Sequence, residues 1–200
     1  MTEPVLVDQT FLLRDDVVAI ARELIGMLLI VKNQSVVKAG IIAETEAYAG
    51  ITDKASHAYG GRRTIRTETL YRAGGTVYVY LCYGVHHLFN IVTNQENIPH
   101  AVLIRGILPV NEKAIPENFR DEFEAWKGIA NGPGKLTKKL GIRASHNASM
   151  LNSDAIWLYK FPEYHPVEIV KTSRIGVDYA GEDAYLPYRF YARQYKPAKI

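Results

Sequence analysis

The sequence has little of what marks several protein classes. Its 200 residues include a single cysteine, Cys82, so no disulfide can form within the chain and a reducing compartment is expected. Neither HExxH nor CxxC occurs, and a set made of His57, His86, His87 and Glu46 lacks any known ligand spacing. We therefore expect no metal and no other cofactor. Internal repeats and low-complexity tracts are also missing, so a repeat architecture is not expected.

Acidic and basic residues are missing from residues 73–95, a stretch long enough to raise the question of a membrane span. Gly75, Gly84 and Asn90 interrupt it, so we expect no span. The first ten residues, MTEPVLVDQT, carry acids where a signal peptide would have basic and then apolar residues. The sequence therefore predicts a cytoplasmic protein without a membrane partner.

The overall composition fits one globular domain. At 48% hydrophobic residues, the chain can bury one sizeable core, so we expect a single domain over residues 1–200. A net charge of +3 is too small to establish a nucleic-acid partner, and the clusters of basic residues could be solvated faces. Thirteen tyrosines against six phenylalanines and two tryptophans favour an aromatic-lined pocket or a stacking surface.

The hydrophobic patterns predict an α+β fold with a mainly antiparallel sheet. A helix is expected over residues 17–25, with acids before it and Gly26 at its end. A charged amphipathic helix is expected over 112–129, and a basic helix after the Gly-Pro-Gly sequence at 132–134. The strand at 35–48 is expected to be interrupted at Gly40. Strands are predicted at residues 27–31, 35–48, 76–83, 86–93, 101–110, 156–159, 167–170 and 188–192.

Residues 41–63 hold the densest polar chemistry of the chain. Period-two alternation predicts one strand face made of Ile42, Glu44, Glu46 and Tyr48, and an opposite face made of Ile41, Ala43 and Thr45. Two carboxylates this close, beside an aromatic wall, can raise the pKa of one of them and make it a general base. The pattern also fits two acids paired with arginines on a solvated strand face. Alternation alone does not choose between Glu44 and Glu46.

A tight hairpin is predicted where the strands at 76–83 and 86–93 meet. Tyr83 lies beside Gly84 at its tip, where an aromatic side chain either packs back onto the protein or contacts a partner. Arg105 lies within an apolar strand and needs an acceptor, which could be a glutamate or an anionic ligand.

One set of short motifs runs in order through most of the chain. It consists of ETEAY at 44–48, His57, GGRRT at 60–64, GGTVYVYLCYG at 74–84, Asn90, AVLIR at 101–105, GPGKLTKKLGI at 132–142, and RIGV and AGE within 174–182. The order and spacing of the whole set identify a family far more specifically than any one motif does. In these residues the chain resembles the alkyladenine (3-methyladenine) DNA glycosylase family.

The resemblance implies a curved, mainly antiparallel sheet flanked by helices, with a β-hairpin that enters the DNA minor groove. It implies a monomeric enzyme that flips a damaged purine out of double-stranded DNA and hydrolyses its N-glycosidic bond. Glu46 then corresponds to the general base, and Arg105 lies beside the attacking water. The other implied roles are base binding by Tyr48, His57, Tyr80 and Asn90, intercalation by Tyr83, and, more weakly, backbone contacts by Arg62, Arg63, Lys135 and Lys138.

Four further expectations accompany the resemblance. Glu44 becomes a structural partner for an arginine rather than a second catalyst. No lysine other than Lys54 lies near the loop, so we expect a monofunctional enzyme without Schiff-base lyase chemistry. A cationic alkylated purine should be a good guest between electron-rich tyrosine rings. His86 and His87, just past the hairpin tip, depart from the family pattern and could alter lesion preference.

Two other functional classes fit parts of the sequence. A damaged-DNA-binding module without catalysis would also need stacking tyrosines and arginines. A metal-dependent hydrolase would use the histidines, although their spacing does not support it.

Overall fold

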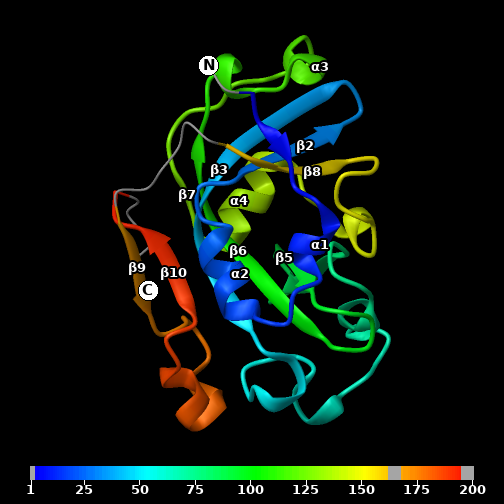
Figure 1. Ribbon diagram of the computed structural model, residues 1–200, viewed down its shortest axis with the longest axis vertical. Helices are drawn as coiled ribbons and strands as arrows, with labels where there is room; N and C mark the ends of the chain where they lie inside the picture. The colour runs from blue at the N-terminus through cyan, green and yellow to red at the C-terminus, as the bar shows by residue number, and fades with distance from the viewer. Residues whose placement is uncertain (1–2, 162–167, 195–200) are drawn as a thin grey trace.

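The longest strand, β3, runs from Val36 to Tyr48 through the middle of an antiparallel sheet (Figure 1). The structure is a computed structural model that describes residues 3–161 and 168–194. In it the strands follow the order β1-β8-β2-β3-β6-β5-β4, while β10 pairs with β3 and β9, and β7 pairs with β6. The described strands are β1 (Val5–Leu6), β2 (Leu28–Asn33), β3 (Val36–Tyr48), β4 (Val77–Cys82), β5 (His86–Thr93), β6 (His100–Pro109), β7 (Ala130–Asn131), β8 (Ile156–Lys160), β9 (Ile169–Thr172) and β10 (Arg189–Ala192).

The helices are few and short. The α-helices are α1 (Gln9–Leu12), α2 (Val17–Glu23), α3 (Glu117–Arg120) and α4 (Pro133–Leu140). The 3-10 helices are η1 (Gly50–Thr52), η2 (Tyr59–Gly61), η3 (Glu68–Tyr71), η4 (Glu112–Ala114), η5 (Ala144–His146) and η6 (Asp178–Tyr185). Asp16 caps α2 by accepting hydrogen bonds from the N–H groups of Val18 and Ala19, as the acids before this helix predicted. Both α2 and α4 contribute side chains to the main hydrophobic cluster. The α+β fold class is therefore confirmed.

The side-chain alternation of β3 reverses within the strand. Ile41 packs in a small cluster on one face, whereas Ile42 and Ala43 both belong to the main cluster on the α2 side. The pairing register with β6 shifts on both sides of Glu44, which marks a bulge. The prediction that Ile42 shares a face with the glutamates is wrong, because alternation holds only within each half of the strand. The predicted interruption at Gly40 is also wrong, since β3 continues through it.

The predicted helix over 112–129 is wrong as well. Only η4 and the four-residue α3 are helical there. The chain then extends along β3: the Val37 N–H donates to the carbonyl of Glu122, and the Glu124 N–H donates to the carbonyl of Val37. Polar composition suggested an exposed helix, but residues 122–124 make backbone hydrogen bonds to the neighbouring strand instead.

The other predicted elements are present with shifted ends. The predicted strand at 167–170 corresponds to β9, which starts at Ile169, and Val167 lies outside the described residues. Sequence patterns did not predict the short β1, α1 and β7. Within the described ranges, no helix combines the length and the apolar character that crossing a membrane requires.

Candidate active site

A cavity of about 430 Å³ opens against the carboxyl-terminal half of β3. Its walls come from β3 to β6, the loop at 55–66 and the segment at 175–179. The lining includes Tyr48, His57, Tyr80, Tyr83, Asn90 and Arg105. The resemblance implied base-binding or wedge roles for five of these residues, and it placed the sixth, Arg105, beside the attacking water. The fold therefore brings the whole aromatic and amide set together at one site.

Glu46 lies directly behind this cavity and is fully buried. Its Oε1 accepts a hydrogen bond from the N–H of Ile175 at 2.8 Å. Its Oε2 accepts from the Tyr48 hydroxyl at 2.8 Å and from an Arg105 guanidinium nitrogen at 3.3 Å. All three donor residues line the cavity. A carboxylate offers about four acceptor positions, so about one remains for a water molecule.

Burial raises the pKa of Glu46 above its ordinary value, while the charge of Arg105 and the hydrogen bonds from Ile175 and Tyr48 partly offset the rise. Burial, together with the neighbouring Glu46 charge, also raises the pKa of Tyr48, so its hydroxyl stays protonated as a donor. Glu46 is thus a carboxylate held by fixed donors, with a proton affinity shifted toward that of a general base.

Glu44 makes a different set of contacts. Its Oε1 accepts from Arg105 Nε at 3.1 Å and from Arg189 Nε, on β10, at 2.7 Å. The expectation that Glu44 pairs with an arginine is confirmed, and the sequence did not predict that a second arginine shares it. The need of Arg105 for an acceptor is met by both glutamates. Two acids and two arginines therefore balance one another behind the cavity.

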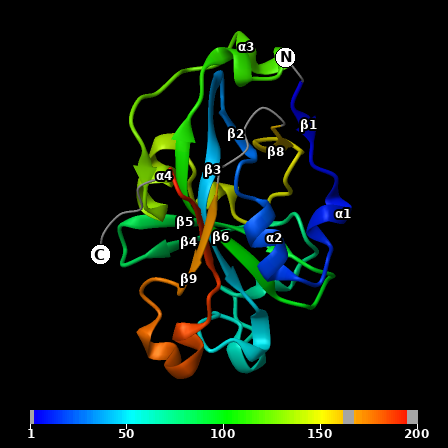
Figure 2. The ribbon, with the colours of Figure 1, turned by 60° about the vertical axis from the view of Figure 1, so that its left-hand side comes forward.

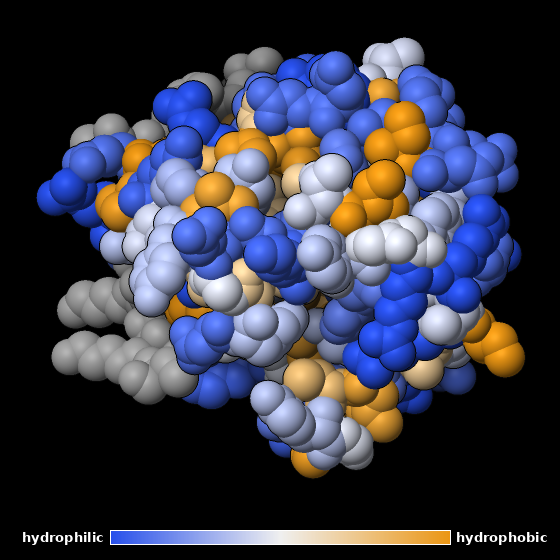
Figure 3. Space-filling view, turned by 90° about the horizontal axis from the view of Figure 1, so that it is seen from below, coloured by the Kyte–Doolittle hydropathy of each residue, from blue (hydrophilic) through white to orange (hydrophobic). Residues whose placement is uncertain are grey.

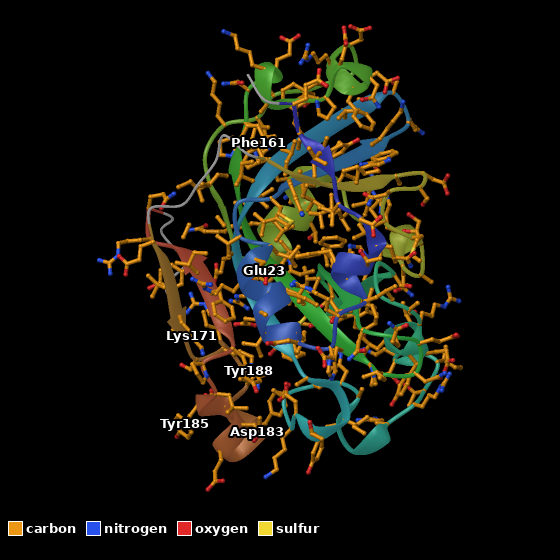
Figure 4. The ribbon with its side chains drawn as sticks, viewed as in Figure 1. Glu23, Phe161, Lys171, Asp183, Tyr185 and Tyr188 are labelled. Carbon is orange, nitrogen blue, oxygen red and sulfur yellow. The ribbon has the colours of Figure 1, made fainter. Side chains whose placement is uncertain are left out.

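A buried ion pair supports the Tyr48 side of the site. Arg174 donates to both carboxylate oxygens of Asp53, and its guanidinium lies 4.9 Å from the centroid of the Tyr48 ring. It also donates to the carbonyl oxygens of Ala47 and Asp183. Figure 4 places Asp183 in the lobe formed by η6, below β9 and β10. This network joins β3, the loop after it and the η6 lobe. Because Ile175 follows Arg174, the network also positions the Ile175 N–H that donates to Glu46.

The opposite wall is aromatic. The rings of His57 and Tyr80 meet edge to face with centroids 4.7 Å apart, and Tyr78 lies 5.3 Å from Tyr80. His57 Nδ1 is 3.1 Å from the Tyr78 hydroxyl. Burial, with the charges of Arg66 and Arg62, lowers the pKa of His57 to about 4. At neutral pH this imidazole is therefore uncharged and acts as a hydrogen-bonding and packing group.

Asn90 lies on β5 opposite Tyr78 of β4, and is buried at the base of the cavity. Its Nδ2 donates to the carbonyl oxygens of Tyr78 and Leu88, at 3.2 and 3.4 Å. These bonds fix the amide against the sheet, so its position cannot easily adjust to a larger guest.

The β4–β5 hairpin projects from the sheet between α4 and the η6 lobe (Figure 2). Tyr83 at its tip is 93% exposed and adopts a φ of +50°, a left-handed conformation that is unfavourable for a large side chain. The alternative that Tyr83 packs back onto the protein is therefore wrong. The hairpin is held by α4, because the Thr137 hydroxyl donates to the carbonyl of His87 at 2.7 Å. Gly134 lies against the His86 ring, where a Cβ would come within 2.8 Å.

The predicted backbone-binding residues are in different situations. Arg63 is already engaged, donating to Glu68 and Asn97. Arg62 forms no ion pair with any described residue and lines a second cavity beside His57. Lys135 and Lys138 are exposed on α4 and lie outside both cavity linings. Figure 3 shows that the lower face of the molecule is mainly hydrophilic, with separate apolar patches.

Several site residues were not predicted. Tyr78, Arg66, Arg174 and the main chain of Ile175 all contribute, and Arg189 completes the charge balance. Tyr78 could have been found, since alternation puts it on the same strand face as Tyr80. Arg174, Ile175 and Arg189 depend on contacts between residues more than a hundred positions apart. Arg66 contacts the nearby Tyr80, but its basic cluster could equally have been a solvated face. Over the described ranges, no group of three or more His, Cys, Asp and Glu side chains could hold a metal ion.

Comparison with known proteins gives a consistent result. The sequence matches the family described as methylpurine-DNA glycosylase over residues 10–196. A protein of Chlamydia pneumoniae, provisionally named a 3-methyladenine DNA glycosylase, is 42% identical over 190 residues, covering 92% of this chain and 94% of the relative. Relatives with the same name from Chlamydia felis (41%, covering 98% and 100%) and Clostridium acetobutylicum (40%, covering 92% and 93%) are similar.

Proposed function

Because the chain belongs to the methylpurine-DNA glycosylase family, we propose that it excises alkylated and other damaged purines from double-stranded DNA. The family and the names of the relatives already make the chain a DNA glycosylase for alkylated bases in repair. The observation that best supports the finer proposal is Glu46: a fully buried carboxylate whose three donors all line an aromatic cavity.

In the proposed reaction the damaged nucleotide is flipped into the cavity, where its base stacks among Tyr48, His57 and Tyr80. Glu46 takes a proton from a water molecule as the water oxygen bonds to C1′ of the sugar. The electron pair of the C1′–N bond leaves with the base. The carboxylate also stabilises the positive charge that develops on the sugar. Arg105 holds Glu46 in place, so the proton acceptor stays fixed relative to the base pocket.

Specificity and DNA distortion are assigned to other residues. We propose that Tyr83 inserts into the duplex where the nucleotide leaves, since its exposure and left-handed backbone present the ring to a partner. Asn90 would crowd the exocyclic amino group of a normal guanine. Arg62, Lys135 and Lys138 would contact DNA phosphates, with Arg63 contributing less because its donors are engaged.

We further propose that the enzyme is a monomer that leaves an abasic site without cleaving the strand. Lys54 is exposed and its backbone N–H bonds to Asp183 in the loop beside the cavity. It is absent from the lining of the base cavity, so a Schiff base with C1′ is not proposed.

The test is base release. Purified protein is incubated with an alkylated duplex and with an undamaged one, and free bases are separated by chromatography. We expect 3-methyladenine or 7-methylguanine in the supernatant, an intact abasic strand, and no effect of a chelator. A correctly folded protein that binds the alkylated duplex but releases nothing would instead be a damage-binding module.

A further inference from the structure

Arg66 is a basic side chain at the base cavity that has no carboxylate partner among the residues the structure describes. It lines the cavity, and its guanidinium carbon lies 5.0 Å from the centroid of the Tyr80 ring. No ion pair joins it to another described residue. It also acts on the neighbouring groups: its charge lowers the pKa of His57, and its hydrogen bond to Tyr78 together with its charge opposes the rise in the pKa of Tyr78. Arg66 therefore adds an uncompensated positive charge at the aromatic wall.

The remaining charges around the cavity cancel. Arg174 lies over the Tyr48 ring but is paired through two hydrogen bonds with Asp53. Behind the cavity the charges belong to Glu44, Glu46, Arg105 and Arg189, two of each sign. His57 is neutral at physiological pH. Lys54 and Arg62, which line the second cavity beside His57, are also positive. Arg66 therefore gives the base cavity a net charge of about +1, and Lys54 and Arg62 add positive charge in the neighbouring cavity.

This charge distribution bears on which base the cavity accepts. A cation near an aromatic ring interacts with the negative potential of the ring face, the same potential that would attract a cationic base. The two positive charges also repel each other in a partly desolvated site. Cationic purines are expected to be favoured guests when only the tyrosine rings are taken into account. With Arg66 in place, a neutral purine can stack without this penalty.

We propose that Arg66 is a specificity-determining residue that disfavours cationic purines relative to neutral ones of the same shape. The inference rests on the proposed function of the cavity, because it concerns the base held there. It extends that function by assigning charge selection to a named side chain. Arg66 can also contact a DNA phosphate, so the test must separate its effect on the base from its effect on the backbone.

The experiment compares two duplexes that differ only in charge at one base. One carries 7-methylguanine, which is cationic, and the other carries its neutral isostere 7-methyl-7-deazaguanine. Dissociation constants are measured with Glu46→Gln protein, so that turnover does not intervene. When Arg66→Gln is added, binding of the cationic duplex should strengthen relative to the neutral one by about two- to fivefold, as typical cation–π energies suggest. Arg66→Lys should leave most of the ratio unchanged, because the charge is kept.

Arg62→Gln is the matched control, since Arg62 is not among the residues that line the base cavity. Arg62→Gln should weaken the binding of both duplexes equally. An unchanged ratio with Arg66→Gln, a shift toward the neutral base, or an equal shift with Arg66→Lys would overturn the inference. So would binding of both lesions no tighter than normal guanine. Release of 7-methylguanine by the wild-type protein is measured separately, and its absence would refute the proposed function while the binding ratio still decides the role of Arg66.

Discussion

Replacing Glu46 with glutamine removes one charge with almost no change in shape. Both carboxylate oxygens accept hydrogen bonds: Oε1 from Ile175, and Oε2 from Tyr48 and Arg105. An amide has only one acceptor oxygen. Whichever way it turns, at least one N–H or O–H then faces an NH2 group that cannot accept it.

The consequences for stability and for rate differ in size. An unsatisfied buried donor costs about 1–3 kcal/mol, partly offset because the buried negative charge, whose pKa is raised by desolvation, is gone. We therefore expect a stability loss of about 1–2 kcal/mol. Losing general-base catalysis should slow base release about 10²- to 10⁴-fold, equivalent to about 3–5 kcal/mol in the activation barrier. Affinity for the lesion duplex should change little.

The assay is single-turnover release of 7-methylguanine from a duplex, with binding and urea unfolding measured on the same preparations. Glu44→Gln is the matched control, because Glu44 is equally buried on the same strand but its donors are Arg105 and Arg189. It should lose comparable stability and much less rate. Equal rate losses in the two variants would refute the assignment of Glu46 as the base.

Three further outcomes are expected. Tyr83→Ser should slow excision of paired lesions more than of unpaired ones, with little change in stability because the ring is exposed; equal slowing would argue against a wedge. Asn90→Ser should increase release of normal guanine relative to the lesion, and unchanged discrimination would remove that assignment. The His57 pKa of about 4 lies below its usual 6.5, so the unfolded state binds more protons between these values and stability falls as pH drops through them. His57 should contribute up to about 1.4 kcal/mol per pH unit to the slope near pH 5, in addition to the contributions of His100 and His146, whose pKa values burial also lowers. His57→Gln should reduce the slope in urea titrations by that contribution; an unchanged slope in the variant would contradict the burial argument.

Local patterns predicted most of the sheet. Alternation and turn residues located β2 to β6, β8 and β10, and the acids before residue 17 marked the start of α2. They failed where the chain used distant partners. Residues 112–129 are polar enough for a surface helix, yet the main chain at 122–124 extends along β3, and no local signal shows that a strand edge is available. The reversal within β3 was missed for the same reason, since a bulge depends on the register of β6.

The motifs predicted the family, which is confirmed, and the structure places the predicted base-binding and wedge residues around one cavity. The sequence did not predict the ion pairs that hold these residues in place. Arg174 and Asp53 are 121 positions apart, and Arg189 and Glu44 are 145 apart. Each is a charged residue that could equally lie in solvent. Only the folded chain shows that these charges are buried and paired, and that Arg66 has no ion-pair partner in the part of the chain that the structure describes.

The bulge in β3 has a consequence for how the length of this strand can change. Before the bulge, the odd-numbered residues of β3, such as Ile41, face away from α2. After the bulge, the even-numbered residues, such as Glu46, face away from α2. Ile42 pairs with Ile107 and Thr45 with Ile104, so two residues of each strand lie between these pairs and the register is the same on both sides. Deleting one of them, such as Ala43, would restore plain alternation in β3 but leave β6 one residue too long between the same pairs. Deleting Thr45 would instead put Glu44 and Glu46 on opposite faces. Among chains of this fold, a change of length in β3 at this point should therefore occur together with a matching change in β6.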